Sequence, residues 1–497
     1  MKIFNFKNKI IGQILIVIIF LSTSSAHSLD KFYKAERVSD YFSGIILLND
    51  DQYENSLKYL KRLEGLEKNH KNYSVKYLYS LVNSGNFKEA FNYSKKLEKQ
   101  NLDTYESHLV SGIFHLKNSN TDLAKKYFFK ANSKNQSLVL NNYVSKSLYN
   151  WSNLTNLDQG EQELKKINDR FENLKKIQNA FLNCYFNNSN TNQLFKEILS
   201  NQTTDFSRYN YFHASYFASI GKIEDAKKII NSALKFYPRN LLINQYKLDL
   251  DKNKNILQFN CRKVEHVIAE ILYITANALS SQSIYSLSNF YLNLAKYLNS
   301  EFISYDTLLA ENFYKTDNLK KAKKIYKNLS KHGEAFHWYS SKQVARIFIL
   351  EKNNIKALEL LKKSYEHLIN KKVYETFDYA EFLKNNEKFK DAIPLYTSII
   401  NQVKKEHPLY PEATDGRGIA YERLGDWEKA ETDFLSSLKV NPEQAYVINY
   451  LAYSWIEKGI KIKQSLNMLE KANRLRSNDP YITDSLGWAL FKLERYE

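Results

Sequence analysis

The side chains that could carry out chemistry in this chain are few and scattered. His332 and His337 lie in the stretch HGEAFH, which at first sight resembles a zinc-binding motif. The helical HExxH motif places its histidines four residues apart on one helix face, whereas these two are five residues apart. No GxSxG turn, phosphate-binding glycine loop or GxGxxG motif occurs in the sequence. We therefore expect no catalytic residues, no metal site and no cofactor, and we predict that the chain is not an enzyme.

The two cysteines of the chain, Cys184 and Cys261, are also far apart in the sequence. They are too few and too distant to form a disulfide framework or a metal site. They therefore neither require nor exclude an oxidising compartment.

The composition favours a long helical protein. The chain has 497 residues, of which 43% are hydrophobic, and only 6 are Pro and 13 are Gly. One compact core rarely serves so long a chain, so we expect an architecture that grows along one dimension. The net charge of +18 could serve an anionic partner or surface. We favour a simpler cause, a genome-wide bias toward AT-rich codons, because the cations are mixed with acidic residues and asparagines throughout.

The N-terminus has the layout of a secretory signal peptide. Lysines within residues 1–9 precede the apolar run IIGQILIVIIFL, and STSSAHS then offers small residues for cleavage. The apolar run is shorter than the roughly 20 residues that a membrane-spanning helix needs. We therefore predict that residues 1–28 direct export, and that the protein is periplasmic or associated with the cell envelope. An uncleaved N-terminal anchor is the alternative.

Small or apolar residues recur about every 34 positions along the chain, which indicates an internal repeat. They occupy nearly every step of this spacing from Gly44 onward, and after one irregular stretch the series resumes at Ala276. A second small residue follows twelve positions later and a large apolar residue sixteen positions later, as in Gly418, Ala430 and Phe434. Small residues let two helix backbones approach closely, while bulky neighbours fill the surrounding groove. Each helical hairpin then leaves an apolar face that only the next hairpin can cover, so the hairpins must stack.

The residues that we assign to this packing share the small-or-bulky pattern of the repeat. They are Gly112, Ala124, Ala214, Ala226, Ala276, Ala310, Ala322, Ala345, Ala357, Ala380, Ala392, Gly418, Tyr421, Ala430, Phe434, Pro442 and Gly487.

Three stretches resemble tetratricopeptide repeats (TPRs): HASYFASIGKIEDAKKIINSALKFYP (213–238), GIAYERLGDWEKAETDFLSSLKVNP (418–442) and LAYSWIEKGIKIKQSLNMLEKANRLRSNDP (451–480). Each ends on a proline where that family closes its second helix. The units from AEILYITANAL onward are also similar to exported TPR-array proteins of alphaproteobacteria. The resemblance implies an all-α fold, a right-handed α-solenoid of stacked helix-turn-helix repeats.

The resemblance divides the chain into four segments. After the signal peptide we predict an N-terminal array at 29–238, divergent at 133–205, then an irregular helical connection at 239–264 and a C-terminal array at 265–497. Pro394 is expected near the first turn of a second helix, where proline is tolerated. The turn that follows the unit at Ala452 is expected to be lengthened. The chain ends where the family places another second helix, so we expect the last repeat to be truncated.

In this family the first helices of successive repeats line a concave groove that takes extended or helical peptide segments. The groove-facing positions lie three before and one after each first-helix small residue. The candidate partner-binding residues chosen on this rule are Tyr273, Asn277, Lys342, Arg346, Phe377, Tyr453 and Trp488. The aromatic ones could anchor a peptide, although for any single residue we favour packing against a neighbouring repeat. The carboxylate clamp of some family members is not expected, because only Lys342 and Arg346 match it.

The leading functional hypothesis is a non-enzymatic scaffold or adaptor of the cell envelope that binds a protein or peptide in the groove. One alternative is the docking arm of an enzyme whose catalytic domain lies beyond residue 497. Another is a basic surface that binds anionic lipid or a polyanion, with peripheral membrane association and binding that weakens with salt. We expect no nucleic-acid partner, because of the export signal, and no small-molecule substrate.

Overall fold

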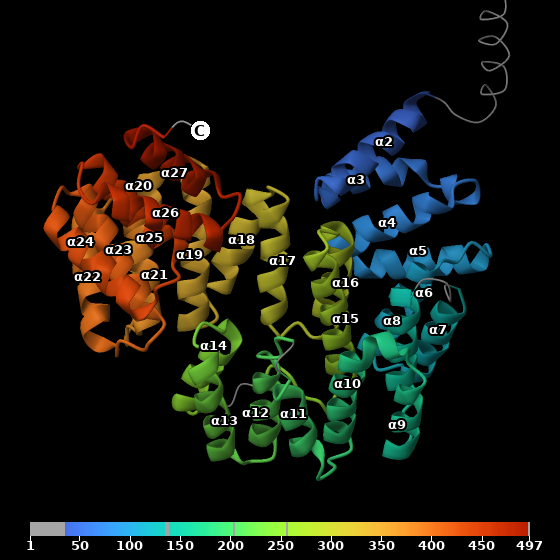
Figure 1. The fold of residues 1–497 in the computed structure, drawn as a ribbon. Coiled ribbons are helices and arrows are strands. Elements are labelled where there is room, and N and C mark those ends of the chain that lie inside the picture. The colour runs from blue at the N-terminus through green and yellow to red at the C-terminus, as the bar shows by residue number, and fades with distance from the viewer. Residues whose placement is uncertain (1–34, 135–138, 202–203, 255–256, 496–497) are drawn as a thin grey trace, which may run out of the picture. The chain divides into compact units, whose positions relative to one another are not determined.

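The computed structural model describes residues 35–134, 139–201, 204–254 and 257–495, and within these ranges all regular secondary structure is helical. The export signal predicted at residues 1–28 lies outside them. The chain separates into two compact units, shown in Figure 1. Unit 1 comprises Met1–Phe236 and Tyr246–Ile325, and unit 2 comprises Tyr237–Gln245 and Tyr326–Glu497.

Unit 1 consists of helical hairpins joined by short turns. Its helices are α2 (Ala35–Asn49), α3 (Tyr53–Leu60), α4 (Lys71–Asn83), α5 (Phe87–Lys99), α6 (Tyr105–Lys117), α7 (Thr121–Lys134), α8 (Val139–Ser152), α9 (Leu157–Lys165), α10 (Glu172–Tyr185), α11 (Thr191–Leu199), α12 (Tyr209–Ser219), α13 (Ile223–Phe236), α15 (Val264–Ser281), α16 (Tyr285–Leu298) and α17 (Ser304–Lys315), with 3₁₀ turns at Lys61–Leu63, Leu66–Lys68 and Asp169–Phe171. A unit boundary falls within each of α14 (Leu241–Asp251) and α18 (Leu319–Leu329).

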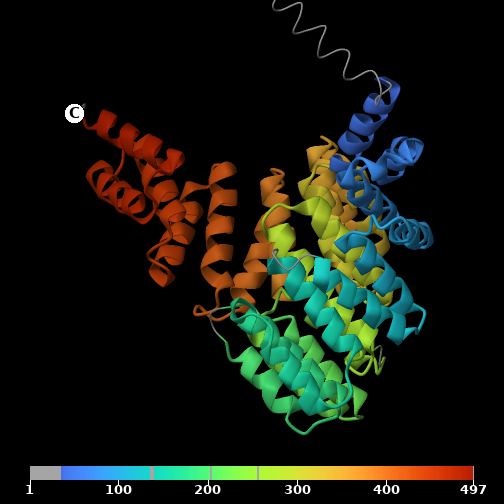
Figure 2. The ribbon, with the colours of Figure 1, turned by 90° about the vertical axis from the view of Figure 1, so that its right-hand side faces the viewer.

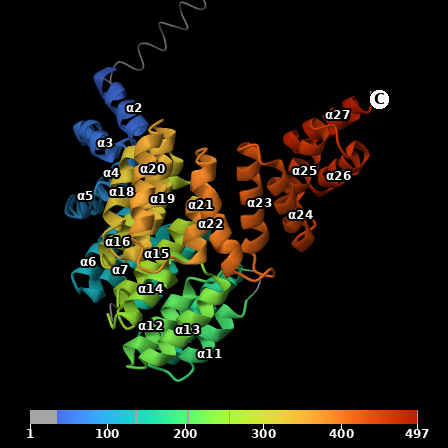
Figure 3. The same ribbon diagram turned by 90° about the vertical axis from the view of Figure 1, so that its left-hand side faces the viewer.

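Unit 2 continues the hairpin pattern, as Figure 3 shows for its successive helices. Its helices are α19 (Glu334–Leu350), α20 (Asn354–Glu366), α21 (Val373–Asn385), α22 (Phe389–Gln402), α23 (Leu409–Arg423), α24 (Trp427–Val440), α25 (Ala445–Glu457), α26 (Ile462–Leu475) and α27 (Pro480–Lys492). The first helices α21, α23 and α25 each pack against the second helix of their own hairpin and against the helix that precedes them. None of the described helices in either unit is both long and apolar enough to cross a bilayer.

The small residues of the repeat lie where the two helices of a hairpin meet. A Cβ atom added to Gly112 would lie 2.4 Å from the ring of Phe128, and one added to Gly418 would lie 2.8 Å from the ring of Phe434. No real Cβ contact is this close, so these positions bring backbone and ring together in a way that a larger residue prevents. The alanines at the other packing positions are fully buried: Ala124, Ala214, Ala226, Ala276, Ala310, Ala322, Ala345, Ala357, Ala380, Ala392 and Ala430.

Three of the residues assigned to packing between helices are not fully buried. Gly487 is exposed, and a Cβ added there would meet nothing within 4 Å. Tyr421 is half-buried, and Pro442, which closes the preceding helix, is exposed.

The stretch in which the repeat is weak is also built of hairpins. Its second helices, α9 and α11, have only 9 residues each, whereas α7 and α13 have 14. The shortened second helices set this stretch apart from the regular repeats, although the 34-residue spacing still meets the buried Ala180 and Ala214.

Unit 1 differs from the predicted N-terminal array because it includes α15 and α16. These two helices pack against α4, α6 and α8, as seen from the side in Figure 2. Asn289 Nδ2 donates a 2.9 Å hydrogen bond to the Tyr53 hydroxyl, and Tyr297 stacks on Phe87 with ring centroids 4.1 Å apart. Periodicity reports neighbours along the sequence, so it could not show that a later hairpin covers these earlier first helices. The connection predicted at 239–264 contains a regular helix, α14.

The two irregularities expected in unit 2 are visible in its helices. The turn after α25 runs from Lys458 to Lys461, one residue more than the Leu424–Asp426 turn after α23. Pro394 lies within α22, but as the sixth residue it falls beyond the first turn, where it was expected and where proline is tolerated.

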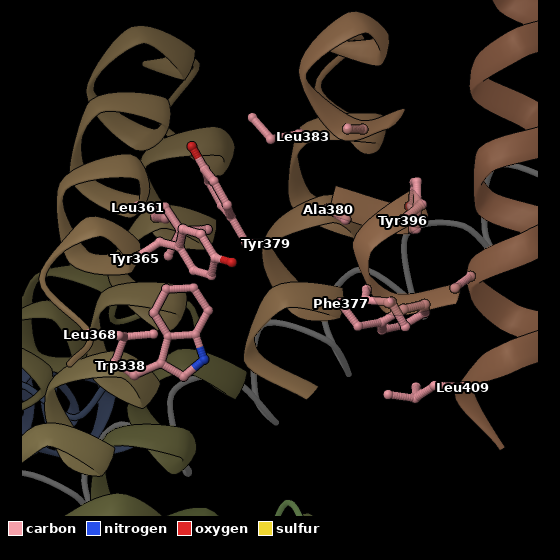
Figure 4. Packing of buried hydrophobic residues seen from close by; sticks show 14 of the residues in the cluster. Trp338, Leu361, Tyr365, Leu368, Phe377, Tyr379, Ala380, Leu383, Tyr396 and Leu409 are labelled. Atoms are coloured by element: carbon pink, nitrogen blue, oxygen red, sulfur yellow. The ribbon is translucent and has the colours of Figure 1, made fainter. Parts of the chain in front are cut away.

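A continuous hydrophobic cluster joins the repeats formed by α19 to α23. Figure 4 shows the rings of Trp338, Tyr365 and Tyr379 on one side of α21 and those of Phe377 and Tyr396 on its other side. The cluster holds the first helices α19, α21 and α23 side by side, and so it positions the surface that they share.

Candidate partner-binding surface

Two of the predicted groove residues lie on α15 in unit 1. Tyr273 is half-buried, and the Arg208 guanidinium lies 4.0 Å from its ring centroid. Arg208 also makes two hydrogen bonds, of 2.8 and 2.9 Å, to the carboxylate of the fully buried Glu270, and a third, of 2.6 Å, to Ser304. Asn277, one turn further along α15, is exposed. Tyr273 therefore belongs to an interior ion-pair cluster and is no open anchor for a peptide.

Three further candidates lie on α19 and α21 in unit 2. The Lys342 ammonium is half-buried and forms an ion pair with Asp378. Phe377 is only 9% exposed and packs near Tyr396 in the hydrophobic cluster. Of the three, only Arg346 is exposed. Two of these three candidates are therefore not free to contact a partner, because Lys342 is paired with Asp378 and Phe377 lies in the core.

A segment from earlier in the chain covers this part of the surface. Arg239 donates a 2.5 Å hydrogen bond to Asp378, and Lys372 donates one of 2.8 Å to Asn244. The Gln245 side chain accepts a 3.0 Å hydrogen bond from the backbone N–H of Ala335, at the start of α19. Residues 238–245 therefore lie across the first helices α19 and α21 of unit 2, which no repeat pattern could indicate.

The first helices α23, α25 and α27 carry the more open candidates. Tyr453 on α25 is 38% exposed. Trp488 on α27 is half-buried, and its indole N–H donates to Glu457 at 2.6 Å. Asp415 and Asn449 occupy the same repeat position on α23 and α25, and Oδ1 of each accepts no hydrogen bond from any described residue. This part of unit 2 thus combines an accessible aromatic ring with two unpaired oxygen acceptors.

The ionised form of Asp415 is disfavoured where it lies. Burial, with smaller contributions from Glu381 and Glu412, raises its pKa to about 7, although Lys384 opposes the shift. A cationic or N–H donor group placed against Asp415 would therefore stabilise its ionised form.

One feature of unit 1 was not foreseen from the sequence. Cys184 and Cys261 form a disulfide, with Cα atoms 6.0 Å apart, although 77 positions separate them. Their sequence distance argued against a framework, but the fold brings α10 and the segment before α15 together for one bridge.

No group of three or more His, Cys, Asp or Glu side chains in the described ranges is arranged to hold a metal ion.

Comparisons with known proteins bear on this fold. No protein-family profile matches the chain. A TPR repeat-containing protein of Pseudomonas aeruginosa is 26% identical over 113 residues, which are 23% of this chain and 18% of that protein. The match therefore spans less than a fifth of that relative's length.

Solved structures give likenesses of fold at low identity. A chain of the APC/C hetero-tetramer Cut9–Hcn1 has a TM-score of 0.35 at 14% identity, covering 97% of this chain and 95% of that one. YrrB, described as a TPR protein with an unusual peptide-binding site, has a TM-score of 0.27 at 17% identity, covering 36% and 89%. The stacked hairpins of both units have the α-solenoid arrangement of tetratricopeptide repeats, and part of the chain is similar to a TPR repeat-containing protein.

Proposed function

We propose that the chain is a non-enzymatic scaffold of the cell envelope that binds a partner protein along the first helices α23, α25 and α27. The observation that carries this proposal is the exposed ring of Tyr453 on α25, which supplies apolar contact area to a bound segment. Asp415 and Asn449, at the same repeat position on α23 and α25, each add an Oδ1 atom that has no hydrogen-bond partner among the described residues. Both atoms are closed off from water, so a side-chain movement must expose them before they accept a hydrogen bond from a partner.

Several other first helices are covered, which supports this choice of site. In unit 1, helices α15 and α16 pack on α4, α6 and α8. In unit 2, residues 238–245 lie on α19 and α21. Within unit 2, a partner that binds first helices therefore has its more accessible contacts on α23, α25 and α27.

The envelope location rests on two independent features. The sequence of residues 1–28 has the layout of an export signal. The Cys184–Cys261 disulfide is of a kind that persists in oxidising compartments and is rare in the cytosol.

Site-specific photo-crosslinking in living cells tests the proposed surface. A photo-crosslinking amino acid replaces Tyr453 on α25, or Leu435 on the second helix α24 as a matched control, since Leu435 is 46% exposed. We expect a discrete adduct from position 453 and none of the same mass from position 435. Tyr453→Ala should then weaken capture of that partner by about tenfold, the usual cost of losing an aromatic anchor. Equal adducts at both positions, or none at 453, would contradict the proposal.

A further inference from the structure

The segment of residues 238–245, which belongs to unit 2, places an arginine against the first helix α21. The Arg239 guanidinium forms an ion pair with Asp378. It also lies 5.2 Å from the ring centroid of Tyr374 and 5.9 Å from that of Phe377. A guanidinium pairs with carboxylates and packs against aromatic rings, so these side chains form a site for arginine. Because Phe377 is one of the candidate partner-binding residues, Arg239 lies where a bound peptide is expected.

The rest of the segment is held by contacts that do not involve Arg239. The Gln245 side chain accepts a 3.0 Å hydrogen bond from the backbone N–H at the start of α19. A Cβ added to Gly333 would lie 2.3 Å from the Gln245 amide, so the glycine leaves the room that this side chain fills. Asn244 accepts a 2.8 Å hydrogen bond from Lys372. The segment therefore keeps these contacts when the Arg239 side chain moves.

Arg239 itself is held loosely. Its side chain is 48% exposed, whereas that of Asp378 is 14% exposed. Asp378 also pairs with the Lys342 ammonium, so it keeps a cationic partner when Arg239 leaves. Release of Arg239 therefore strands no buried charge, which is the main cost of breaking an ion pair of this kind.

The surface beneath the segment is incompletely filled. A cavity of about 90 Å³ lies between the segment and helices α19 and α21, and Arg239, Tyr374 and Asp378 are among the residues that line it. One water molecule needs roughly 10–15 Å³ of such space. An incoming side chain therefore has room beside Asp378 without breaking a packed core.

We infer that Arg239 is a displaceable intramolecular ligand, and that the site formed by Asp378, Tyr374 and Phe377 binds an arginine side chain of a partner polypeptide. In the folded chain Arg239 occupies this site and lowers its affinity for a competing arginine. A partner's arginine gains the Asp378 carboxylate and the Tyr374 ring when Arg239 moves out into solvent. The site lies on α21, so it does not depend on the surface proposed on α23, α25 and α27.

Fluorine NMR of the purified full chain labelled with 5-fluorotryptophan tests this inference, because Trp338 lines the same cavity. The signal that disappears in Trp338→Phe belongs to Trp338. Acetyl-arginine amide should shift that signal saturably in Arg239→Ala, whereas the neutral analogue acetyl-citrulline amide should not. In the parent chain the half-saturating concentration should be at least about tenfold higher, because the tethered Arg239 competes for the site. The matched variant Arg346→Ala, which removes an exposed arginine of α19, should behave as the parent chain does.

A second set of variants tests the residues of the site in the Arg239→Ala background. Asp378→Asn should raise the half-saturating concentration by about tenfold, because it removes charge-assisted hydrogen bonds. Tyr374→Leu should raise it by about threefold, through loss of the cation–π contact. Asp391→Asn, which changes an exposed aspartate of α22, is the control and should leave it unchanged.

Four results would overturn the inference. Two are the absence of a saturable shift in Arg239→Ala, and equal half-saturating concentrations in Arg239→Ala and the parent chain. A third is an equal effect of Asp378→Asn and Asp391→Asn. The fourth is tighter binding of free L-arginine, with its charged amino and carboxyl groups, than of acetyl-arginine amide, because that order would assign the site to the free amino acid.

Discussion

Asp415 shows how one residue can link stability to partner binding. Its pKa is raised to about 7 by burial, whereas an aspartate in the unfolded chain titrates near 3.8. Between these values the folded state holds a proton that the unfolded state has released. The stability contributed at this position therefore falls as the pH rises from about 4 to about 7, by about 1.4 kcal/mol for each unit of the pKa shift.

Asp415→Asn should remove this pH dependence. The variant has no proton to lose, so we expect it to match the parent chain near pH 4 and to be more stable than it near pH 8. Urea unfolding across this pH range measures the difference, and Asp484→Asn, at the equivalent but exposed position of α27, serves as the control. A difference between parent and variant that is the same at both pH values would show that Asp415 does not titrate in this range.

Single residues also show where sequence reasoning is strong. The spacing of twelve and sixteen residues predicted which side chains meet inside a hairpin, because those partners lie close in the sequence. It could not predict that Arg208 would lie over Tyr273, or that Arg239 would reach Asp378. A repeat position fixes the face on which a residue lies, but a contact partner more than sixty positions away leaves no periodic signal.

At the scale of the element, Pro394 weakens helix α22. It is the sixth residue of the helix, so it lacks the N–H that would bond the Lys390 carbonyl. Its side chain is exposed, so replacing it removes little packing. We expect Pro394→Ala to raise the free energy of unfolding by about 1–2 kcal/mol, which is less than the full ~3 kcal/mol penalty because the unfolded chain also gains freedom.

Chemical denaturation of the purified chain measures the effect of this replacement. Lys390→Ala, at an exposed position one turn earlier in the same helix, is the control and should change stability by less than about 0.5 kcal/mol. An unchanged or lower stability in Pro394→Ala would mean that the helix is already adapted to its proline.

Helix lengths separate the regular repeats from residues 133–205. In unit 2, second helices such as α20, α22 and α24 have 13 or 14 residues and carry the second small residue and the bulky residue of the pattern. In the divergent stretch, α9 and α11 have 9 residues each, so the hairpins are kept although the helices are shorter. The element survives the loss of its sequence signature, because packing needs an apolar face and not a particular repeat length.

At the scale of the whole molecule, the disulfide ties distant parts of unit 1 together. It closes a loop between residues separated by 77 positions, which restricts the unfolded chain strongly. We expect the double replacement Cys184→Ser and Cys261→Ser to lower the free energy of unfolding by about 4–5 kcal/mol, on a chain-entropy estimate for a loop of this length. Thermal unfolding with and without a reductant measures the loss, and the reductant should have no effect on the double variant.

The same bridge reports the compartment in which the chain folds. When cells are lysed directly into denaturant that contains a thiol-alkylating reagent, the full chain should stay unmodified, whereas both cysteines of a variant that lacks residues 1–28 should be modified, because the denaturant exposes these buried side chains. Equal modification of the two forms would show that formation of the disulfide does not depend on residues 1–28.

The hairpin of α15 and α16 also imposes an order of events on synthesis. Helices α4, α6 and α8 emerge from the ribosome well before residues 264–298, which later cover them. Until then, rings such as Phe87 and Tyr105 lack the partners Tyr297 and Tyr291 that shield them in the finished unit. Contacts between residues this far apart form slowly. The N-terminal half therefore exposes an apolar face until α15 and α16 have been synthesised. A holdase chaperone that protects this face would be released when these two helices pack onto it.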